Sequence, residues 1–399
     1  MNAESESDKL SARDANVPTG PLEVRPGCWM VGKRNPSTLL QCNTYLRTFE
    51  SRGTKTNVCV DPGSQFDFTT IAENITQLTG GLDNIQALSL NHQDPDVVGN
   101  ARFLFDANPD VTVMVTEETW RLVQHLLFEP KRVEFVNPVR SRLASVDPQN
   151  PWRLVPTPFC HFRGAMAFYD PEIRTLFSGD LFGGLNELGM VHLVADESDW
   201  AGIAQFHQIY MPSREGLRYA VRQIRALDPP VQVIAPQHGH VITGGLVPLF
   251  LERMHELLVG QDLLTVELDE SYLKSYQEVF ARMLARAGQD LGRREIAERL
   301  SRLGDDRLEQ AVRVQGNHVY LDREAYSAVV KAFARLTTGE PPDFVNVLRD
   351  VVLTACQELS VPIPPIGTGV QDSPITDYQV VNDPPTRPRR SSARKRRRS

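Results

Sequence analysis

Short apolar runs alternate with longer amphipathic stretches along the first 255 residues of the chain. Runs rich in β-branched and aromatic residues predict strands at Cys42–Phe49, Asn57–Asp61, Ala87–Leu90, Val111–Val115, Ile173–Ser178 and Val231–Ala235. Apolar residues at helical spacing predict helices at Phe68–Leu78, Thr116–Leu127, Trp200–Tyr210 and Ser213–Leu227. Because strands and helices alternate, we expect residues 22–255 to form a domain of the α/β (α+β) class.

The pattern changes after about residue 262, where helical spacing of apolar residues dominates up to residue 360. This pattern predicts a small, mostly helical second domain at 262–360. Within it, Ala311–Leu321 surrounds Gly316-Asn317 and predicts a strand or a hairpin. Residues 1–21 are polar and residues 361–399 are rich in Pro, Gly, Asp and Ser, so we expect a disordered leader and a disordered basic tail.

Composition narrows the class of protein. Hydrophobic residues make up 41% of the chain and charged residues 23%, as in ordinary globular proteins. The last thirteen residues carry eight positive charges, so the formal charge of −7 leaves about −15 on the rest. Such an acidic body gives no reason to expect a nucleic-acid partner.

Five cysteines without a CxxC pair argue against a disulfide framework. The start of the chain lacks an apolar signal core. No apolar run approaches the roughly 20 residues of a membrane-spanning helix. We therefore expect a cytoplasmic protein without a transmembrane segment.

Potential metal ligands follow several of the apolar segments. They are three imidazoles and three carboxylates, namely His92, Asp94, Asp96, His161, Asp180 and His238. Loops that leave strand ends can direct such side chains into one pocket, and Gly179 permits a sharp turn just before Asp180. A mixed nitrogen and oxygen set suits iron or manganese, with zinc as an alternative. We therefore expect a dinuclear metal site.

The order of these residues, with Val60-Asp61-Pro62-Gly63 before them, resembles the metallo-β-lactamase fold. Within that fold it is similar to the diiron core of flavodiiron proteins and of related oxygen-binding diiron proteins. Phe206–Pro212 resembles the family's aromatic helix that ends in Met-Pro, and Ile234–Gly239 resembles its last ligand-bearing strand. The resemblance covers about residues 22–245 and implies an αββα sandwich with two irons at one edge.

The resemblance also implies how the six residues divide. His92, Asp94 and His161 would hold one iron, Asp96 and His238 the other, and Asp180 would bridge the two together with a water or hydroxide. Hydrolases of this fold carry His-x-His-x-Asp-His, whereas this chain has Asp94 and Val97 at the second and third of those histidines. Flavodiiron proteins usually have glutamate where Asp94 stands, and they often keep a histidine where Val97 stands.

The region after residue 262 lacks the Gly/Ser/Thr-rich loop that would hold a flavin phosphate. We therefore expect no FMN in this chain, and a reductase would need an external electron donor. Flavodiiron relatives pair head to tail so that one subunit's flavin meets another's iron. That reason for a dimer is missing here, although a homodimer stays open.

Three further residues are candidates for supporting the ligands, namely His240, His207 and Tyr210. For His207 and Tyr210 a packed helix face is the simpler interpretation, and His240 would share a strand face with His238. Asp61 is expected to be a structural turn carboxylate below the site, and Cys160 a small packed side chain.

These observations favour a non-haem diiron protein that binds O2 or nitric oxide and senses or reduces it. As an enzyme it would be an oxidoreductase of the flavodiiron type. The helical domain and tail would report the state of the site to a signalling partner protein, or mediate dimerisation. The alternative is a dinuclear metallohydrolase acting on an ester, thioester or phosphoester. A third hypothesis is a signalling module that keeps only a structural metal site.

Overall fold

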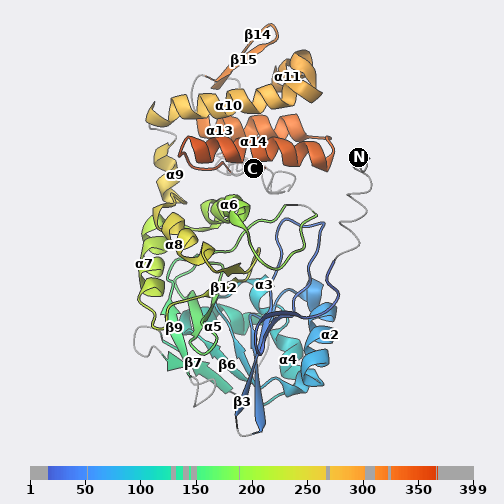
Figure 1. The fold of residues 1–399 in the computed structure, drawn as a ribbon, viewed down its shortest axis with the longest axis vertical. Helices are drawn as coiled ribbons and strands as arrows, with labels where there is room; N and C mark the ends of the chain where they lie inside the picture. The colour runs from blue at the N-terminus through green and yellow to red at the C-terminus, as the bar shows by residue number, and fades with distance from the viewer. Residues whose placement is uncertain are drawn as a thin grey trace, which may run out of the picture.

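Two β-sheets pack face to face and carry helices on their outer faces (Figure 1). The computed structural model describes residues 17–51, 53–126, 132–137, 143–144, 151–187, 189–266, 270–301, 311–321, 325–364 and 366. Most of the predicted leader and nearly all of the predicted basic tail lie outside these residues. No helix in the described ranges is both long and apolar enough to cross a membrane.

The first sheet has seven strands in the order β1-β2-β3-β4-β5-β6-β7. They are β1 (Leu22–Arg25), β2 (Cys28–Met30), β3 (Tyr45–Ser51), β4 (Thr54–Val60), β5 (Ala87–Ser89), β6 (Thr112–Val115) and β7 (Arg132–Phe135). Strands β1 to β4 are antiparallel neighbours, whereas β4 to β7 run parallel. The carboxyl ends of the parallel strands therefore meet at one edge of the sheet, where their loops can share a site.

The second sheet has six strands in the order β13-β12-β11-β10-β9-β8. They are β8 (Leu143–Ala144), β9 (Trp152–Pro156), β10 (Met166–Asp170), β11 (Thr175–Gly179), β12 (Val233–Pro236) and β13 (Ile242–Thr243). Only β11 and β12 run parallel within it, and the other neighbours are antiparallel. The loops after β11 and β12 consequently leave the sheet side by side.

The space between the sheets is filled by aromatic side chains. The fully buried Trp152 ring lies 6.0 Å from Phe49, 5.8 Å from Phe168 and 5.3 Å from Phe177, measured between ring centroids. Each such tilted pair contributes about 0.5–1.5 kcal/mol beyond the burial of its area. This rigid centre holds the two sheets, and hence the loops at their edge, in one relative position.

Helices cover both outer faces of the sandwich. The first sheet is covered by α2 (Phe68–Thr79), α3 (Pro95–Val98), α4 (Ala101–Ala107) and α5 (Glu117–Val123). The second sheet is covered by α6 (Trp200–Tyr210), α7 (Arg214–Arg225) and α8 (Leu246–Glu256). The αββα sandwich implied by the resemblance is therefore the observed architecture.

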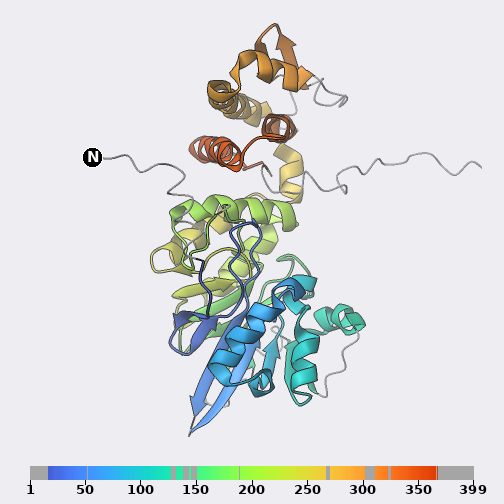
Figure 2. The ribbon, with the colours of Figure 1, turned by 90° about the vertical axis from the view of Figure 1, so that its right-hand side faces the viewer.

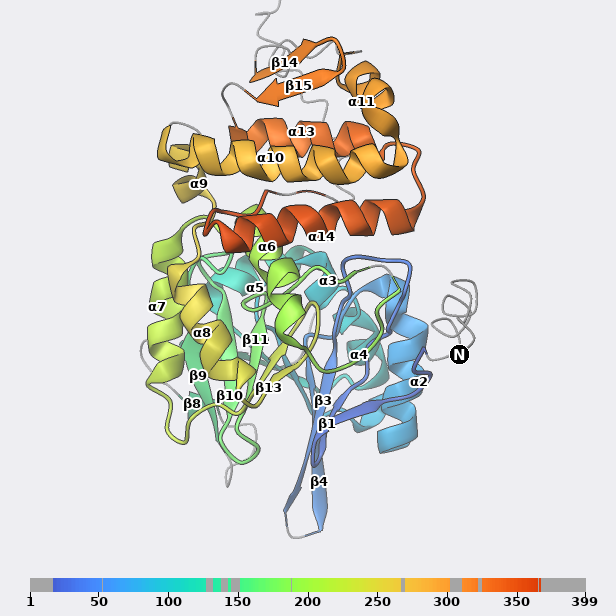
Figure 3. The same ribbon diagram turned by 45° about the horizontal axis from the view of Figure 1, so that its top comes forward.

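The remaining elements form a helical layer beyond α6. It is made of α10 (Glu270–Asp290), α11 (Gly292–Ser301), α13 (Ala325–Thr337) and α14 (Pro342–Glu358), with a hairpin of β14 (Val312–Gln315) and β15 (His318–Leu321). The short helix α9 (Gln261–Val266) leads into it. Figures 2 and 3 show this helical layer at one end of the sandwich, with α14 lying over α6. One continuous apolar cluster joins the layer to α6, α7 and α8.

The predicted elements agree with the structure to within a few residues. The helix predicted at Trp200–Tyr210 has those bounds, and Gly316 and Asn317 form the turn of the β14–β15 hairpin. The sequence pattern did not predict β1, β2, β7, β8, β9, β10 and β13. Strand β10 is buried along its whole length, so it lacks the alternation of apolar and polar residues that indicates a half-buried strand.

Candidate metal centre

The loop after β5 delivers the first three candidate ligands. The buried Asp61 carboxylate accepts a hydrogen bond from the Asn91 backbone N–H at 2.9 Å, and this contact fixes the start of the loop. Burial raises the pKa of Asp61 to about 8. His92 follows directly, and Asp94 is the N-cap of α3, whose first residue is Pro95. Proline suits this first helical position, because its φ is already near the helical value. Asp61 is thus a turn carboxylate below the site, as expected.

The loops after the parallel strands β11 and β12 deliver Asp180 and His238. Gly179 has φ +60, and a Cβ there would lie 2.9 Å from the Asn91 side chain. Glycine therefore allows both the turn and the close approach of the two loops. The His238 Nδ1 donates a hydrogen bond to the Gln41 carbonyl oxygen at 2.7 Å. Because a carbonyl only accepts, Nδ1 carries a proton, and Nε2 is the ring nitrogen that faces the site.

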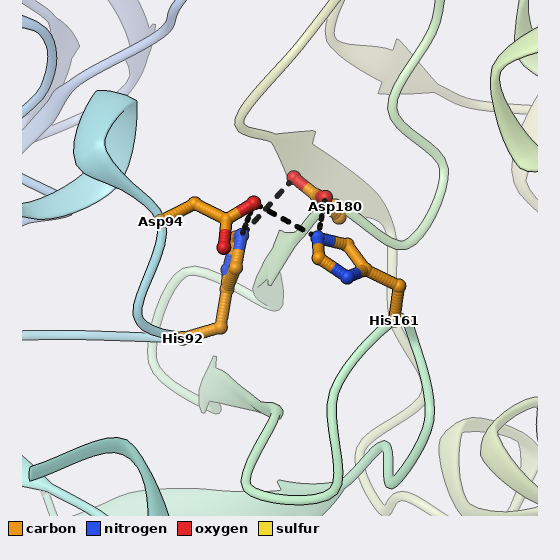
Figure 4. Close-up of side chains that lie close together, drawn as sticks. All are labelled: His92, Asp94, His161 and Asp180. Atoms are coloured by element: carbon orange, nitrogen blue, oxygen red, sulfur yellow. Dashed lines mark hydrogen bonds and ion pairs between the residues drawn. The ribbon is translucent and has the colours of Figure 1, made fainter. Parts of the chain in front are cut away.

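Four side chains converge in what we call the first donor group, namely His92, Asp94, His161 and Asp180 (Figure 4). His161 Nε2 lies 2.9 Å from Asp94 Oδ2 and 3.2 Å from Asp180 Oδ2. His92 Nε2 lies 3.5 Å from Asp180 Oδ1. These separations are those of donor atoms that surround one ion, since metal–ligand bonds of about 2.0–2.2 Å place neighbouring donors at such distances.

A second donor group lies beside the first and consists of Cys42, Asp96 and His238. His238 Nε2 lies 3.4 Å from Asp96 Oδ2 and 3.3 Å from Asp180 Oδ1. Asp180 therefore contacts both groups, since Oδ2 approaches His161 and Oδ1 lies near both His92 and His238. Val97 is fully buried in the apolar cluster that contains Leu90 and Ile71.

Electrostatic interactions between histidines and carboxylates of the site shift their pKa values. Hydrogen bonds to Asp180 and Asp94 raise the pKa of His161 to about 10. Burial alone would raise the pKa of Asp180, but His92, His161 and His238 hold that pKa well below its usual range. Burial likewise opposes protonation of His238, yet Asp180 raises its pKa well above the usual value. Without a metal, Asp94 and Asp180 are charged, and the protons on His161 and His238 balance them.

Two buried atoms in the site have no hydrogen-bond partner, namely His92 Nε2 and Asp180 Oδ1. Their side chains are only 1% and 4% exposed. Each buried polar atom without a partner costs about 1–3 kcal/mol of folding free energy. Two such atoms in one site therefore indicate a binding partner. A cation held between the two groups would satisfy both atoms, and imidazole with carboxylate is a donor set that suits iron, manganese or zinc. The residues present therefore fit a dinuclear metal centre.

Helix α6 forms one wall of the site and holds the loop that carries Asp180. The buried His207 donates from Nδ1 to the Ile203 carbonyl at 2.8 Å and accepts from the Phe182 N–H at 3.0 Å. Burial lowers the pKa of His207 to about 4, which keeps the ring neutral. His207 therefore anchors the loop that carries Asp180. The Tyr210 ring centroid lies 6.3 Å from that of His161.

The third supporting candidate, His240, lies in a separate cluster. Its Nδ1 contacts Asp199 Oδ1 at 2.7 Å, and its ring stacks on His192 with the centroids 3.9 Å apart. No regular spacing in the sequence links His192, Asp199 and His240. Cys42 was also missed, because only folding brings it beside Asp96, 54 positions later.

A cavity of about 470 Å³ opens beside the second donor group. Asp96 lines it together with apolar residues of the α3 region, and Phe66, which is 97% exposed, stands in its wall. Asp96 is thus the donor residue that borders this cavity.

Known proteins resemble this chain over the sandwich. The type A flavoprotein FprA of Rhodobacter capsulatus is 27% identical over 241 residues, which are 56% of this chain and 53% of the relative. The chain thus spans about half the length of that relative. The chemotaxis sensor ODP from T. denticola, solved in its apo state, is 24% identical over 61% of this chain and 96% of its own, with a TM-score of 0.51.

A structure of the same sensor described as a peroxy diiron species has a TM-score of 0.50 and 24% identity, over 61% of this chain and 97% of its own. Rubredoxin oxygen:oxidoreductase of Desulfovibrio gigas has a TM-score of 0.52 at 13% identity, over 67% of this chain and 70% of its own. These likenesses show the shared fold. The family model "ODP family beta lactamase" matches residues 40–239, half of the chain. The chain therefore belongs to the ODP family of β-lactamase-fold proteins.

Proposed function

We propose that this protein is a non-haem diiron protein that binds O2 or nitric oxide at the joined donor groups and senses that ligand. The observation that carries the proposal is Asp180, whose carboxylate contacts histidines of both the first and the second donor group. A carboxylate so placed would bridge two ions. The names of two structural relatives, a diiron sensor and an oxygen oxidoreductase, support the choice of ligand.

The charges of the carboxylates suit two divalent metal ions. Asp94, Asp96 and Asp180 bring three negative charges against the four positive charges of two divalent ions. A fourth anionic donor would bring the buried site to neutrality, which limits the cost of burying it. Asp94 stands where hydrolases of this fold carry histidine, and hard carboxylate donors favour iron or manganese over zinc.

When bound, two ferrous ions would supply the open positions and electrons that a diatomic ligand needs. The chain's own residues hold and enclose them. Phe206, whose ring centroid lies 5.2 Å from that of His238, covers the second donor group, and His207 keeps the Asp180 loop in place. The cavity beside Asp96 admits a small ligand without opening the fold.

We further propose that helix α6 carries the signal from the site to the helical layer. One side of α6 presents Phe206 and Tyr210 to the donor groups. Its Gln205 accepts a hydrogen bond from Arg349 of α14 at 2.8 Å. Gln205 also donates to the carbonyls of Pro364 and Ile366, at 3.2 and 2.9 Å. A shift of α6 on ligand binding would therefore change the contacts of α14. Steady reduction of the ligand would in addition need electrons from another protein.

The test is metal analysis of protein purified without oxygen, followed by visible spectra before and after addition of O2 or nitric oxide. We expect two irons per chain and a new charge-transfer band with the added ligand. Asp180→Asn should abolish the band, whereas the surface variant Asp106→Asn should keep it. Two zincs, no spectral change and turnover of a model ester would replace the proposal with the metallohydrolase alternative.

A further inference from the structure

The two donor groups are unequal in the number of family-type ligands they contain. The first has His92, Asp94 and His161 in addition to the Asp180 bridge, whereas the second has only Asp96 and His238. The residue after Asp96 is Val97, which has no donor atom and is fully buried among apolar side chains. The second position therefore lacks one protein ligand unless another residue supplies it.

Cys42 lies where such a ligand would be. Its Sγ is 3.7 Å from Asp96 Oδ2. Its sulfur, a carboxylate oxygen of Asp96 and a ring nitrogen of His238 all lie within 4.8 Å of one another. The unpartnered and buried Asp180 Oδ1 points into the same space, 3.3 Å from His238 Nε2. Three donor types and an unsatisfied bridging oxygen thus surround one position.

The backbone sets the position of Cys42. On one side of it, the Gln41 carbonyl accepts the hydrogen bond from His238 Nδ1 at 2.7 Å. On the other side, the Asn43 N–H donates to the Gln237 carbonyl at 2.6 Å. The Asn43 side chain also donates to the Pro236 and Gly239 carbonyls, at 3.0 and 3.1 Å. Residues 41–43 are therefore fastened to the loop that carries His238, and the sulfur is held at the site.

The other four cysteines differ from Cys42 in their surroundings. Cys28, Cys59, Cys160 and Cys356 are all buried in apolar clusters, and Cys42 alone of the five is half-buried. Cys160 precedes His161 in the chain, yet it packs in the cluster of Leu217 and Phe206. Accessibility and placement therefore single out Cys42.

We propose that Cys42 is a thiolate ligand of the second metal ion, completing the group of Asp96, His238 and the shared Asp180. This inference rests on the proposed function, because it requires a metal in the second donor group. On binding, the sulfur forms a bond to the metal and its proton leaves to solvent, so no oxidant or reductant is needed. A sulfur ligand is soft and favours iron or zinc over manganese at that position.

The decisive experiment is X-ray absorption at the metal edge on the full chain loaded with Fe(II) without oxygen. We expect a sulfur scatterer at about 2.3 Å, at about one sulfur for every two metals. The signal should be lost in Cys42→Ser and retained in the matched variant Cys356→Ala, which removes a buried cysteine in α14.

A second measurement on the unaltered protein does not depend on how the variant folds. Iodoacetamide should modify Cys42 in the metal-free protein, and loading with Fe(II) should slow that modification at least tenfold, as read by peptide mass spectrometry. Two bound irons with only nitrogen and oxygen scatterers, and equal alkylation rates, would overturn the role of Cys42 and leave the diiron proposal intact. A chain that takes up no metal would overturn both.

Discussion

The two donor groups are neighbours that share Asp180, but they are built differently. The first draws its other ligands from loops after β5 and β9, and His161 contacts two carboxylates there. The second depends on the segment before β3, because Gln41 orients His238 and Cys42 adds a sulfur. Asp96 of the second group lines the cavity beside α3. From this difference we propose a division of labour, in which the ion beside Asp96 receives the incoming ligand.

The largest effect should come from removing Asp180, the residue that the two donor groups share. Asp180→Ala removes the bridge, and we expect both metal positions to lose affinity by more than about a hundredfold. Loss of even an outer hydrogen-bond partner costs about 10–100-fold. Equilibrium titration with Fe(II) by calorimetry would measure this, with the 70% exposed Asp106→Asn as the control. Retention of one tight ion by Asp180→Ala would show that the groups are independent.

Variants that remove a ligand from one donor group should show whether the two groups bind metal independently. His161→Ala removes a ligand of the first donor group, and Asp96→Ala removes one of the second. We expect each variant to keep about one metal per chain where the unaltered protein has two. Ligand-induced spectral change should be weaker in Asp96→Ala, because that position faces the cavity. Equal loss of both ions in either variant would contradict the division of labour.

The thermal stability of the metal-free protein should depend on pH because of the first donor group. Its carboxylates raise the pKa of His161 to about 10 from a usual value near 6.5. This interaction therefore stabilises the fold fully below pH 6.5, and its contribution is lost as the pH rises through 10. We expect the melting temperature of the metal-free protein to fall between pH 7 and 9. His161→Gln should flatten that slope, and an unchanged slope would exclude a charged His161.

Metal binding should show the opposite pH trend. The protonated imidazoles must release their protons before they can ligate, so affinity for Fe(II) should increase from pH 6 to pH 8. Isothermal titration in buffers of different ionisation enthalpy counts the protons released. Affinity that does not change with pH would mean that the imidazoles are neutral before the metal arrives.

The smallest effect on the site should come from the contact between α6 and α14. Gln205→Ala removes hydrogen bonds to Arg349 and to the 364–366 segment, each worth about 1 kcal/mol. We expect metal content to stay unchanged, while ligand binding no longer alters hydrogen exchange in α14. Gln208→Ala, which breaks only a bond to Leu258, is the matched control. Ligand-dependent exchange that persists in Gln205→Ala would exclude this route.

Much of the sandwich could be predicted because its parallel strands carry unbroken apolar runs that end in polar loops. The sequence order of His92, Asp94, Asp96, His161, Asp180 and His238 was sufficient to expect their convergence, and the structure brings them together. Helix α6 could be predicted from the helical spacing of its apolar residues, and Phe206–Pro212 also resembles a family helix. In each case the signal is local in the sequence or borne by a motif.

The remaining features depend on contacts between distant segments. Strands β9 and β10 were missed, and their places in the second sheet are set by antiparallel pairing with each other and with β8 and β11. Cys42 reaches Asp96 only through the backbone pairing of residues 41–43 with the His238 loop. The cluster of His192, Asp199 and His240 likewise forms across a span that no spacing rule connects. Such contacts are properties of the packed chain.

The most direct test of the account is a crystal structure of the chain loaded with Fe(II) without oxygen, using anomalous scattering at the iron edge. The account predicts two iron peaks, one within bonding distance of His92, Asp94 and His161 and one within bonding distance of Asp96 and His238. Asp180 should contact both. A single peak, or two peaks without a shared Asp180, would contradict it.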